Sequence, residues 1–405
     1  MTLRIFDTLT LKKRAFTKRS GLVKIFLCGP TVYDFCHIGH ARTFVAFDTI
    51  VRYLRYRGYK TKVVMNVTDI SEGISRNAKR TGQSSRDYSD DYFRFFLEDA
   101  KSLGIETIDV FACASGNIPE MMNWIERLLE KGVAYVTDEG VYLDTSRVKG
   151  YGALSHQSRS EIALRRLNLS PAKRHPEDFP LWSILQADTD TWDSPWGRGR
   201  PGEHMEDAAA CLKHLGVPYD INGGGNELVF PHHEATKAQL EGVTGTSVCR
   251  YWLHTGLLYV KGRKMSKSLG NSITIRDILT QYDLQTLRLF FSLTQYRKPI
   301  HFRRLDLEKA VKLSRRLRAQ LAELEQASTR CHREDSAGSV NTMSLQFEER
   351  FVKAMDDDFD TETAVREVIA FADCLVKDLH LRRKRQGFSN ALELMAKLSS
   401  ILGLV

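Results

Sequence analysis

The chain has few cysteines and no long apolar segment. Its 7 cysteines, an odd number among 405 residues, follow no regular spacing, which argues against a scaffold of disulfides. No apolar run approaches the roughly 20 residues that a membrane-spanning helix needs. The N-terminus lacks the basic segment and apolar core of a secretory signal. We therefore expect a cytoplasmic protein without a membrane partner.

The composition is that of a globular protein. Hydrophobic residues make up 42% of the chain and charged residues 27%. The length suggests two or three domains. The formal net charge of +9 is compatible with a nucleic-acid partner. The basic residues are spread along the chain, however, and runs such as residues 315–318 and 382–385 are typical of solvated helix faces.

Residues 22–67 are predicted to form one β-α-β unit. The apolar residues between 23 and 27 predict a buried strand. Apolar residues at helical spacing then predict a helix that begins just past His40 and ends at Gly58. Residues 62–67 predict a second strand, apolar on both faces as in a parallel sheet covered by helices.

The turn at residues 28–40 has the pattern of an anion-binding site. A Gly-Pro break after the strand leads into the N-terminus of the helix, where free N–H groups and the helix dipole favour negative charge. His37 and His40 could donate hydrogen bonds to phosphate oxygens there. Because ligands of parallel sheets bind at the carboxyl ends of the strands, Cys28 and Thr68 are expected to lie near the same ligand.

The middle of the chain alternates between helical patterns and turns. Helices are predicted at residues 85–103, 119–129 and 205–215, and a β-hairpin at residues 134–143. Residues 147–201 lack periodicity but contain tryptophans, which indicates an ordered loop.

Two later segments are suited to binding phosphates or nucleotides. Three consecutive glycines at residues 223–225 permit close backbone approach to a ligand. At residues 262–271, Lys264 and Lys267 lie between serines and glycines in a cationic loop that could follow a phosphate as charge develops. Beyond residue 275 the pattern is helical.

Several segments together resemble a known family. Residues 37–40 (His-Ile-Gly-His) and 264–268 (Lys-Met-Ser-Lys-Ser) resemble the two signature motifs of class I aminoacyl-tRNA synthetases. Residues 26–34, 194–197 and 230–234 narrow the resemblance to the cysteinyl-tRNA synthetases. It extends over nearly the whole chain.

The resemblance implies an α/β fold, namely a Rossmann-type catalytic domain with a parallel sheet, an inserted connective subdomain and a C-terminal α-helical bundle. The small anticodon-binding domain that follows the bundle in the family is expected to be missing. The implied divisions are a first catalytic half at 1–115, the insertion at 116–200, a second catalytic half at 201–275, stem-contact helices at 276–326 and the bundle at 343–405.

The resemblance also implies a two-step reaction. An amino-acid carboxylate attacks the α-phosphate of ATP, pyrophosphate leaves, and the acyl group of the adenylate passes to a tRNA acceptor stem or another amine or hydroxyl acceptor. Mg²⁺ would accompany ATP, and we expect a monomer. The implied catalytic residues are His37, His40, Lys264 and Lys267. The implied ATP-binding residues are Gly29, His37, Gly39, His40, Gly223, Gly224, Glu227 and Lys267.

The family binds a zinc ion that holds the thiolate of substrate cysteine. At the positions of its four ligands this chain has Cys28, Asp207, His232 and Thr236, so two ligands are replaced. Aspartate can bind Zn²⁺ through oxygen, whereas a neutral threonine is a poor ligand. A weakened Zn²⁺ site of Cys28, Asp207 and His232 and an empty site both stay open. Cys211, about one helical turn beyond Asp207, is a less favourable substitute.

The replacements cluster at the amino-acid pocket. Glu203 stands where the family has tryptophan, Asn222 where it has histidine, and Gly73 where it has lysine. We interpret this as a changed pocket around retained adenylation chemistry. Glu203 and Asp207 add negative charge, which favours a substrate side chain with an amine or several hydrogen-bond donors. The residues expected to form the pocket are Cys28, Thr68, Glu203, Asp207 and His232.

Other functions stay open at this point. The chain could be a genuine, shortened cysteine–tRNA ligase, which bound zinc would favour. It could instead be a non-catalytic tRNA-binding module derived from a synthetase, or a duplicate that is losing its function. The intact phosphate motifs, at residues 37–40 and 264–268, weigh against the last two.

Overall fold

A parallel sheet of five strands forms the centre of the computed structural model, in the order β11-β10-β3-β4-β5. This confirms the predicted α/β class. The strands are β3 (Leu22–Leu27), β4 (Lys60–Val67), β5 (Val110–Cys113), β10 (Tyr219–Gly225) and β11 (Cys249–Thr255). The structure describes residues 2–18, 21–165, 170–185, 190–260, 262–265, 270–328, 338–382 and 388–404.

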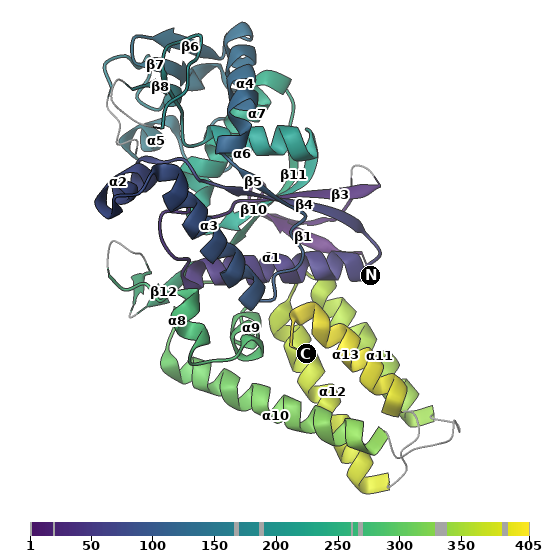
Figure 1. Cartoon of the computed structure of the whole chain (residues 1–405). Helices are drawn as coiled ribbons and strands as arrows, with labels where there is room; N and C mark the ends of the chain where they lie inside the picture. Colours follow the sequence, from purple (N-terminus) through teal and green to yellow (C-terminus); the bar gives the residue numbers. More distant parts are fainter. Residues whose placement is uncertain are drawn as a thin grey trace.

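Both faces of the sheet are covered, as its apolar strands require. In β3, Val23 and Ile25 belong to one core cluster, whereas Phe26 belongs to the other. One face packs on α1 and the C-terminal helices, and the other on α4, α6 and α7 (Figure 1). The bounds of these helices, with the flanking α2 and α3, are α1 (Ile38–Tyr56), α2 (Glu72–Thr81), α3 (Ser85–Ser102), α4 (Ile118–Glu130), α6 (Met205–Ala210) and α7 (Glu234–Thr244).

Helix α1 begins at Ile38, earlier than the pattern of apolar residues predicts. His37 is its N-cap: the Nδ1 atom of His37 accepts from the N–H of His40 at 3.3 Å, and Nδ1 of His40 accepts from the N–H of His37 at 3.2 Å. The two side chains thus satisfy backbone donors that a helix start leaves open. Because histidine is not a usual capping residue, the sequence pattern did not reveal this start.

The inserted subdomain contains more structure than predicted. Its hairpin is confirmed, with β6 (Ala134–Thr137) antiparallel to β7 (Gly140–Leu143). Within the segment predicted to be loop, however, β8 (Phe179–Ile184) and β9 (Gly199–Pro201) extend this hairpin to a four-stranded sheet, and α5 (Arg159–Arg165) forms a short helix. A proline within β8 and a register shift between β7 and β8 obscure the alternation that marks a strand.

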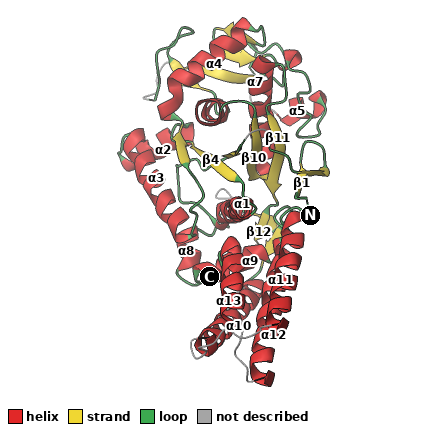
Figure 2. Cartoon of the chain, turned by 90° about the vertical axis from the view of Figure 1, so that its right-hand side faces the viewer, coloured by secondary structure: helices red, strands yellow, loops and turns green. Residues whose placement is uncertain are grey.

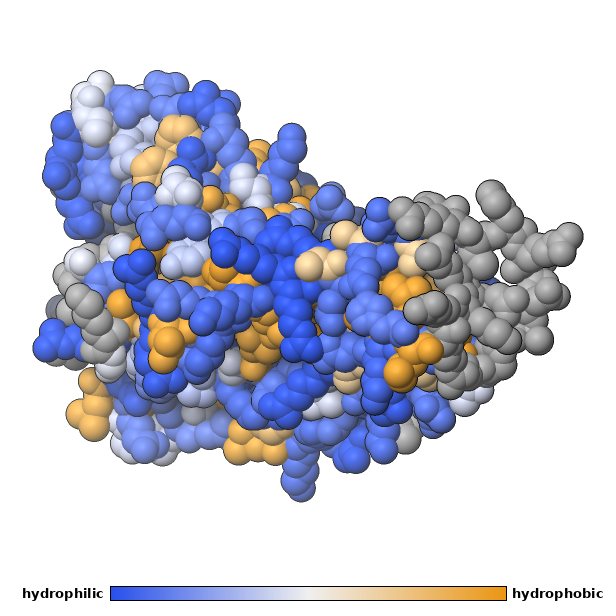
Figure 3. Space-filling model, turned by 90° about the horizontal axis from the view of Figure 1, so that it is seen from below, coloured by the Kyte–Doolittle hydropathy of each residue, from blue (hydrophilic) through white to orange (hydrophobic). Residues whose placement is uncertain are grey.

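The remainder of the chain packs below the main sheet (Figures 1 and 2). Helices make up most of this part, as predicted, but a three-stranded sheet of β12, β13 and β14 precedes the bundle. The face seen from below is mostly hydrophilic with separate apolar patches (Figure 3). The elements are β12 (Leu258–Val260), β13 (Arg263–Lys264), α8 (Ile275–Leu279), α9 (Leu284–Ser292), β14 (Ile300–Phe302), α10 (Arg304–Ser328), α11 (Gly338–Asp356), α12 (Thr361–Arg382) and α13 (Phe388–Leu402), and the N-terminal hairpin is β1 (Arg4–Asp7) with β2 (Lys12–Ala15).

Within the described ranges, none of the helices combines the length and the apolar character needed to cross a bilayer. The domain boundaries given above stay predictions.

Candidate active site

One cavity of about 540 Å³ lies where strands β3, β4 and β10 end. Its walls come from the turn after β3, the start of α1, the segments after β4 and β10, and the start of α6. This is the carboxyl edge of the parallel sheet, where ligands of such folds bind. The predicted site residues that line it are Cys28, Gly29, His37, His40, Thr68, Glu203, Asp207, Glu227 and His232.

His37 and His40 form a paired donor site at the start of α1. Their rings stack with centroids 3.8 Å apart and planes within 1° of parallel. Since each Nδ1 accepts a backbone hydrogen bond, a neutral ring carries its proton on Nε2 and offers it as a donor. A Cβ atom on Gly39 would lie 3.0 Å from the His37 ring, so glycine keeps the pair in place. Two N–H donors at the positive end of a helix suit phosphate oxygens.

The turn that carries Cys28 is held by the neighbouring strands. The N–H of Cys28 donates to the carbonyl of Gly223 at 2.9 Å, and the N–H of Gly29 donates to Oδ1 of Asn66 at 2.7 Å. A Cβ atom on Gly29 would lie 2.0 Å from the backbone oxygen of Asn66. Position 29 therefore accepts only glycine. The backbone hydrogen bonds at residues 28 and 29 fix the point from which the Cys28 side chain enters the cavity.

The glycine triplet packs closely against the protein, and the predicted role of Gly223 and Gly224 in binding ATP stays a prediction. It lies inside β10, where a Cβ atom on Gly223 would come within 2.2 Å of the Phe47 ring. On Gly224 it would come within 2.8 Å of the His233 ring. Packing against the protein itself therefore accounts for these two glycines, whereas Gly225 lines the cavity.

Of the two predicted lysines, the structure describes the backbone of Lys264. Lys264 ends β13 and pairs with Tyr259 of β12. The next residue, Met265, is buried and lines the cavity. Strand β13 thus brings the start of the second motif, Lys264 and Met265, to the cavity. Lys267 lies outside the described residues.

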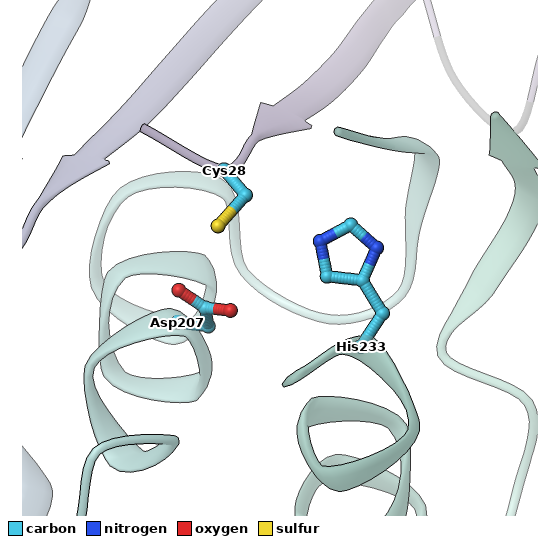
Figure 4. Close-up of side chains that lie close together, drawn as sticks. All are labelled: Cys28, Asp207 and His233. Carbon is cyan, nitrogen blue, oxygen red and sulfur yellow. The ribbon is translucent and has the colours of Figure 1, made fainter. Parts of the chain in front are cut away.

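A group of metal-binding side chains lies deep in the cavity region, formed by Cys28, Asp207 and His233 (Figure 4). One ligand atom from each lies within 4.8 Å of the other two. Cys28 follows β3, Asp207 belongs to α6 and His233 immediately precedes α7. The Nδ1 atom of His233 lies 2.8 Å from Nε2 of His254, while its Nε2 is buried without a hydrogen-bond partner.

The predicted third member of this group, His232, lies next to His233 in the chain, and its role as a metal ligand stays a prediction. His232 lines the cavity and packs edge-to-face on His204, with ring centroids 4.8 Å apart. The chain makes an irregular turn before α7, with extended backbone at Phe230, and this turn decides which of the two adjacent histidines faces Cys28. Matching by motif cannot resolve such a one-residue difference in direction.

Two acidic residues of the pocket region, Asp207 and Glu206, accept hydrogen bonds from threonines. Thr236 donates to Oδ2 of Asp207 at 3.1 Å, and Thr68 donates to Oε1 of Glu206 at 2.5 Å. Burial raises the pKa of Asp207 to about 7. Burial, together with the neighbouring Asp207 charge, also raises the pKa of Glu206 and that of the Cys28 thiol. Glu206 was not among the predicted pocket residues, although its position beside Asp207 on α6 could have suggested it.

The donor set fits a zinc ion in kind. Thiolate, imidazole and carboxylate are all zinc ligands, and three protein ligands leave a position open for a substrate atom or water. Among the described residues, the buried Nε2 of His233 has no hydrogen-bond partner, and its Nδ1 lies 2.8 Å from the imidazole of His254, a contact that would fix the orientation of a ligating histidine. Thr236, the fourth family position, is engaged with Asp207 and contributes no charge.

Comparison with known proteins agrees with this architecture. The family model described as "tRNA synthetases class I (C) catalytic domain" matches residues 15–312. The cysteine–tRNA ligase of Thermococcus onnurineus is 38% identical over 412 residues, covering 100% of this chain and 87% of the relative. The enzyme of the same name from Persephonella marina is 40% identical over 409 residues, covering 99% of this chain and 83% of the relative.

Solved structures share the fold at low sequence identity. Methionyl-tRNA synthetase of Mycobacterium tuberculosis, in complex with methionyl-adenylate, superposes with a TM-score of 0.71 at 14% identity, covering 95% of this chain and 90% of that one. A leucyl-tRNA synthetase of Agrobacterium radiobacter in a ternary complex superposes with a TM-score of 0.68 at 11% identity, covering 96% and 84%.

The parallel sheet, with its histidine pair at the start of α1, defines a class I aminoacyl-tRNA synthetase, a ligase that uses ATP and forms an aminoacyl adenylate. Within this class, the chain belongs to the cysteinyl-tRNA synthetase family.

Proposed function

We propose that this enzyme activates an amino acid other than cysteine with ATP and transfers the aminoacyl group to an acceptor. The observation that carries the proposal is the contact between Asp207 and Thr236. These residues occupy two of the four positions where the family binds zinc, and Thr236 donates a hydrogen bond to Asp207 at 3.1 Å. Both residues are buried and hydrogen-bonded to each other. Two of the four side chains that would hold the zinc ion for a cysteine thiolate have therefore changed together.

ATP binding is supported by the geometry at the start of α1. His37 and His40 present N–H donors to the cavity, and Lys264 and Lys267 supply positive charge from the second motif as charge builds on the phosphates. Gly29, Gly39, Gly223 and Gly224 shape the surrounding backbone, and Glu227 lines the cavity on the side of β10. Mg²⁺ accompanies ATP in this proposal and offsets its negative charge.

The amino-acid side chain binds among Cys28, Thr68, Glu203, Asp207 and His232, all of which line the cavity. Glu203 lies where the family has tryptophan and adds a carboxylate. Gly73 also lines the cavity, in place of a lysine. Both differences make the pocket more negative, which favours a substrate side chain with an amine or several hydrogen-bond donors.

Zinc, if it is bound, is held by Cys28, Asp207 and His233. It would act as a Lewis acid toward a sulfur, nitrogen or oxygen atom of the substrate side chain. The protein contributes the orientation of the ligands, because His254 holds His233 through its Nδ1 atom and Thr236 holds the Asp207 carboxylate.

The acceptor is the acceptor stem of a tRNA or another molecule with a free amine or hydroxyl group. The alternative proposal, a genuine cysteine–tRNA ligase, is favoured by the relatives of that name and by the retained Cys28. A non-catalytic tRNA-binding module would not need the stacked histidine pair.

One experiment separates these functions: ATP–pyrophosphate exchange over a panel of amino acids, with metal analysis of the same sample. Exchange with an amine-bearing amino acid above the rate with cysteine supports the proposal. Exchange with cysteine in a protein that holds stoichiometric zinc would establish the cysteine ligase instead. If ATP binds but no amino acid supports exchange, the chain is a binding module. The variant His40→Asn controls for exchange by contaminating synthetases.

A further inference from the structure

Arg42 has a buried guanidinium group whose partners are backbone carbonyls. The residue lies on α1, directly after the histidine pair, and is 2% exposed. One nitrogen donates to the carbonyls of Gly256 at 2.7 Å and Leu257 at 2.9 Å. The other donates to Tyr296 at 3.2 Å and to Lys298. Among the described residues, no carboxylate forms an ion pair with it.

The four carbonyls belong to the two segments that lead into β12 and β14. These strands pair in parallel, with Leu258 opposite Ile300. Strand β12 also pairs with β13, which ends at Lys264. The two segments touch closely, since a Cβ atom on Gly256 would lie 2.4 Å from the carbonyl of Lys298. Through the Arg42 side chain, α1 therefore holds the two segments from which β12 and β14 begin.

The residue after the hairpin, Met265, and the segment at residues 273–275 also contact the histidine turn. The Cε atom of Met265 would lie 3.2 Å from a Cβ atom on Gly39. The N–H of Ile38 donates to the carbonyl of Ile273, and the N–H of Ile275 donates to that of Cys36, both at 2.9 Å. The histidine motif thus contacts the chain on both sides of the lysine motif. Arg42 makes the largest number of these contacts, through hydrogen bonds to four backbone carbonyls.

Arginine suits this task for geometric reasons. Its planar fork presents five donors at fixed angles, whereas a lysine ammonium is a point charge with three donors and cannot reach two pairs of carbonyls at once.

We infer that Arg42 is a positioning residue for amino-acid activation: it fixes the β12–β13 hairpin, and with it Lys264, in register with His37 and His40. The inference rests on the proposed activation reaction. Arg42 touches no reacting atom; it acts on the transition state only through Lys264, which ends the hairpin. Its loss should therefore lower the rate of adenylate formation and leave amino-acid binding intact.

The test is a double-mutant cycle with Arg42→Lys and Lys264→Ala, measured as ATP–pyrophosphate exchange with the preferred amino acid. Arg42→Lys should lower kcat about 100-fold, because misplacing a catalytic group by about 1 Å has an effect of this size. The KM for the amino acid should change less than about twofold. If Arg42 acts through Lys264, the double variant should be no slower than Lys264→Ala alone.

Arg288 provides a matched control. It is also a buried arginine, with hydrogen bonds to the carbonyls of Leu402 and Leu103, and it pairs with Asp48 away from the hairpin. The effect of Arg288→Lys should multiply with that of Lys264→Ala. If the effects of Arg42→Lys and Lys264→Ala also multiply, or if Arg42→Lys raises KM and leaves kcat unchanged, the inference is wrong.

A second variant keeps the test decisive if Arg42→Lys does not fold. Gly256→Ala forces the two carbonyl segments apart without changing Arg42, so it should give the same loss of kcat at constant KM. An unchanged kcat for a folded Gly256→Ala protein would contradict the inference. Absence of exchange in the unaltered enzyme would instead refute the proposed activation reaction, so the two failures are distinguishable.

Discussion

Thr236 donates a hydrogen bond to the Asp207 carboxylate at 3.1 Å, inside the position where the family binds zinc. The same hydroxyl lies 3.0 Å from the backbone carbonyl of His232, so its single proton is shared between two acceptors, the carboxylate and this carbonyl. The contact shows that side chains at 207 and 236 face each other. Restoring the family's cysteine at 207 and glutamate at 236 would therefore place both side chains close enough to bind the same metal ion.

We predict that Asp207→Cys/Thr236→Glu gains zinc and cysteine activation together. The purified variant should bind about one equivalent of zinc, as a four-ligand site does, and should exchange pyrophosphate with cysteine at least about 10-fold faster than the parent. Metal analysis and exchange assays measure the two gains. Asp207→Ser/Thr236→Gln has similar side-chain sizes without the ligands and should show neither.

A second prediction concerns the packing of the glycine triplet. Gly223→Ala places a methyl group against the Phe47 ring, at a nominal 2.2 Å, and should lower the free energy of unfolding by about 1–3 kcal/mol. Phe47→Leu in the same chain removes the clash and should restore part of this loss. Urea denaturation of both single variants and the double variant measures the coupling. Strictly additive effects would show that Gly223 is not held by this contact.

The sequence predicted the elements whose signal is local. The apolar runs of β3 and β4, the helical spacing of α3 and α4, and the hairpin β6–β7 all appear where the patterns place them. Strands β8 and β9 were missed because their signal is weak and they gain stability by pairing with β7 and with each other. Strand β10 was not predicted, because its three glycines at residues 223–225 carry no side-chain pattern typical of a strand.

The residues of the site likewise fall into those that the sequence could predict and those that it could not. Residues tied to a motif, such as His37 and His40, could be placed from the sequence, and they do line the cavity. That His233, and not His232, lies within 4.8 Å of the Cys28 and Asp207 ligand atoms could not be predicted, since it depends on the irregular turn before α7. Arg42 was also missed, because a residue whose partners are all backbone carbonyls leaves no pattern in the sequence.

The lysine loop yields a third prediction. Lys267→Ala should lower the rate of adenylate formation about 100-fold, because positive charge that meets the developing phosphate charge acts in the transition state. The affinity for the amino acid should stay within about twofold. Single-turnover formation of the adenylate gives the rate, and equilibrium binding of the amino acid gives the affinity. An unchanged rate would remove Lys267 from the mechanism.

The pH dependence of stability should depend on Asp99. Burial raises the pKa of this α3 carboxyl to about 6, although Arg276 lies 3.0 Å away and opposes the shift. In the unfolded chain the pKa is near 3.9. The folded state therefore binds the proton more tightly, and this group's contribution to stability is full below about pH 4 and is lost as the pH rises through about 6.

Asp99→Asn should remove this contribution to the pH dependence. Between about pH 4 and pH 6.5, the free energy of unfolding of the parent should fall by about 1–2 kcal/mol more than that of the variant. Urea denaturation at a series of pH values measures the difference. Glu98→Gln removes a neighbouring negative charge that also raises the pKa of Asp99, so it should reduce the slope in part, whereas Asp99→Asn should remove it. Parallel curves for Asp99→Asn and the parent would show that Asp99 is ionised in the folded protein throughout this range.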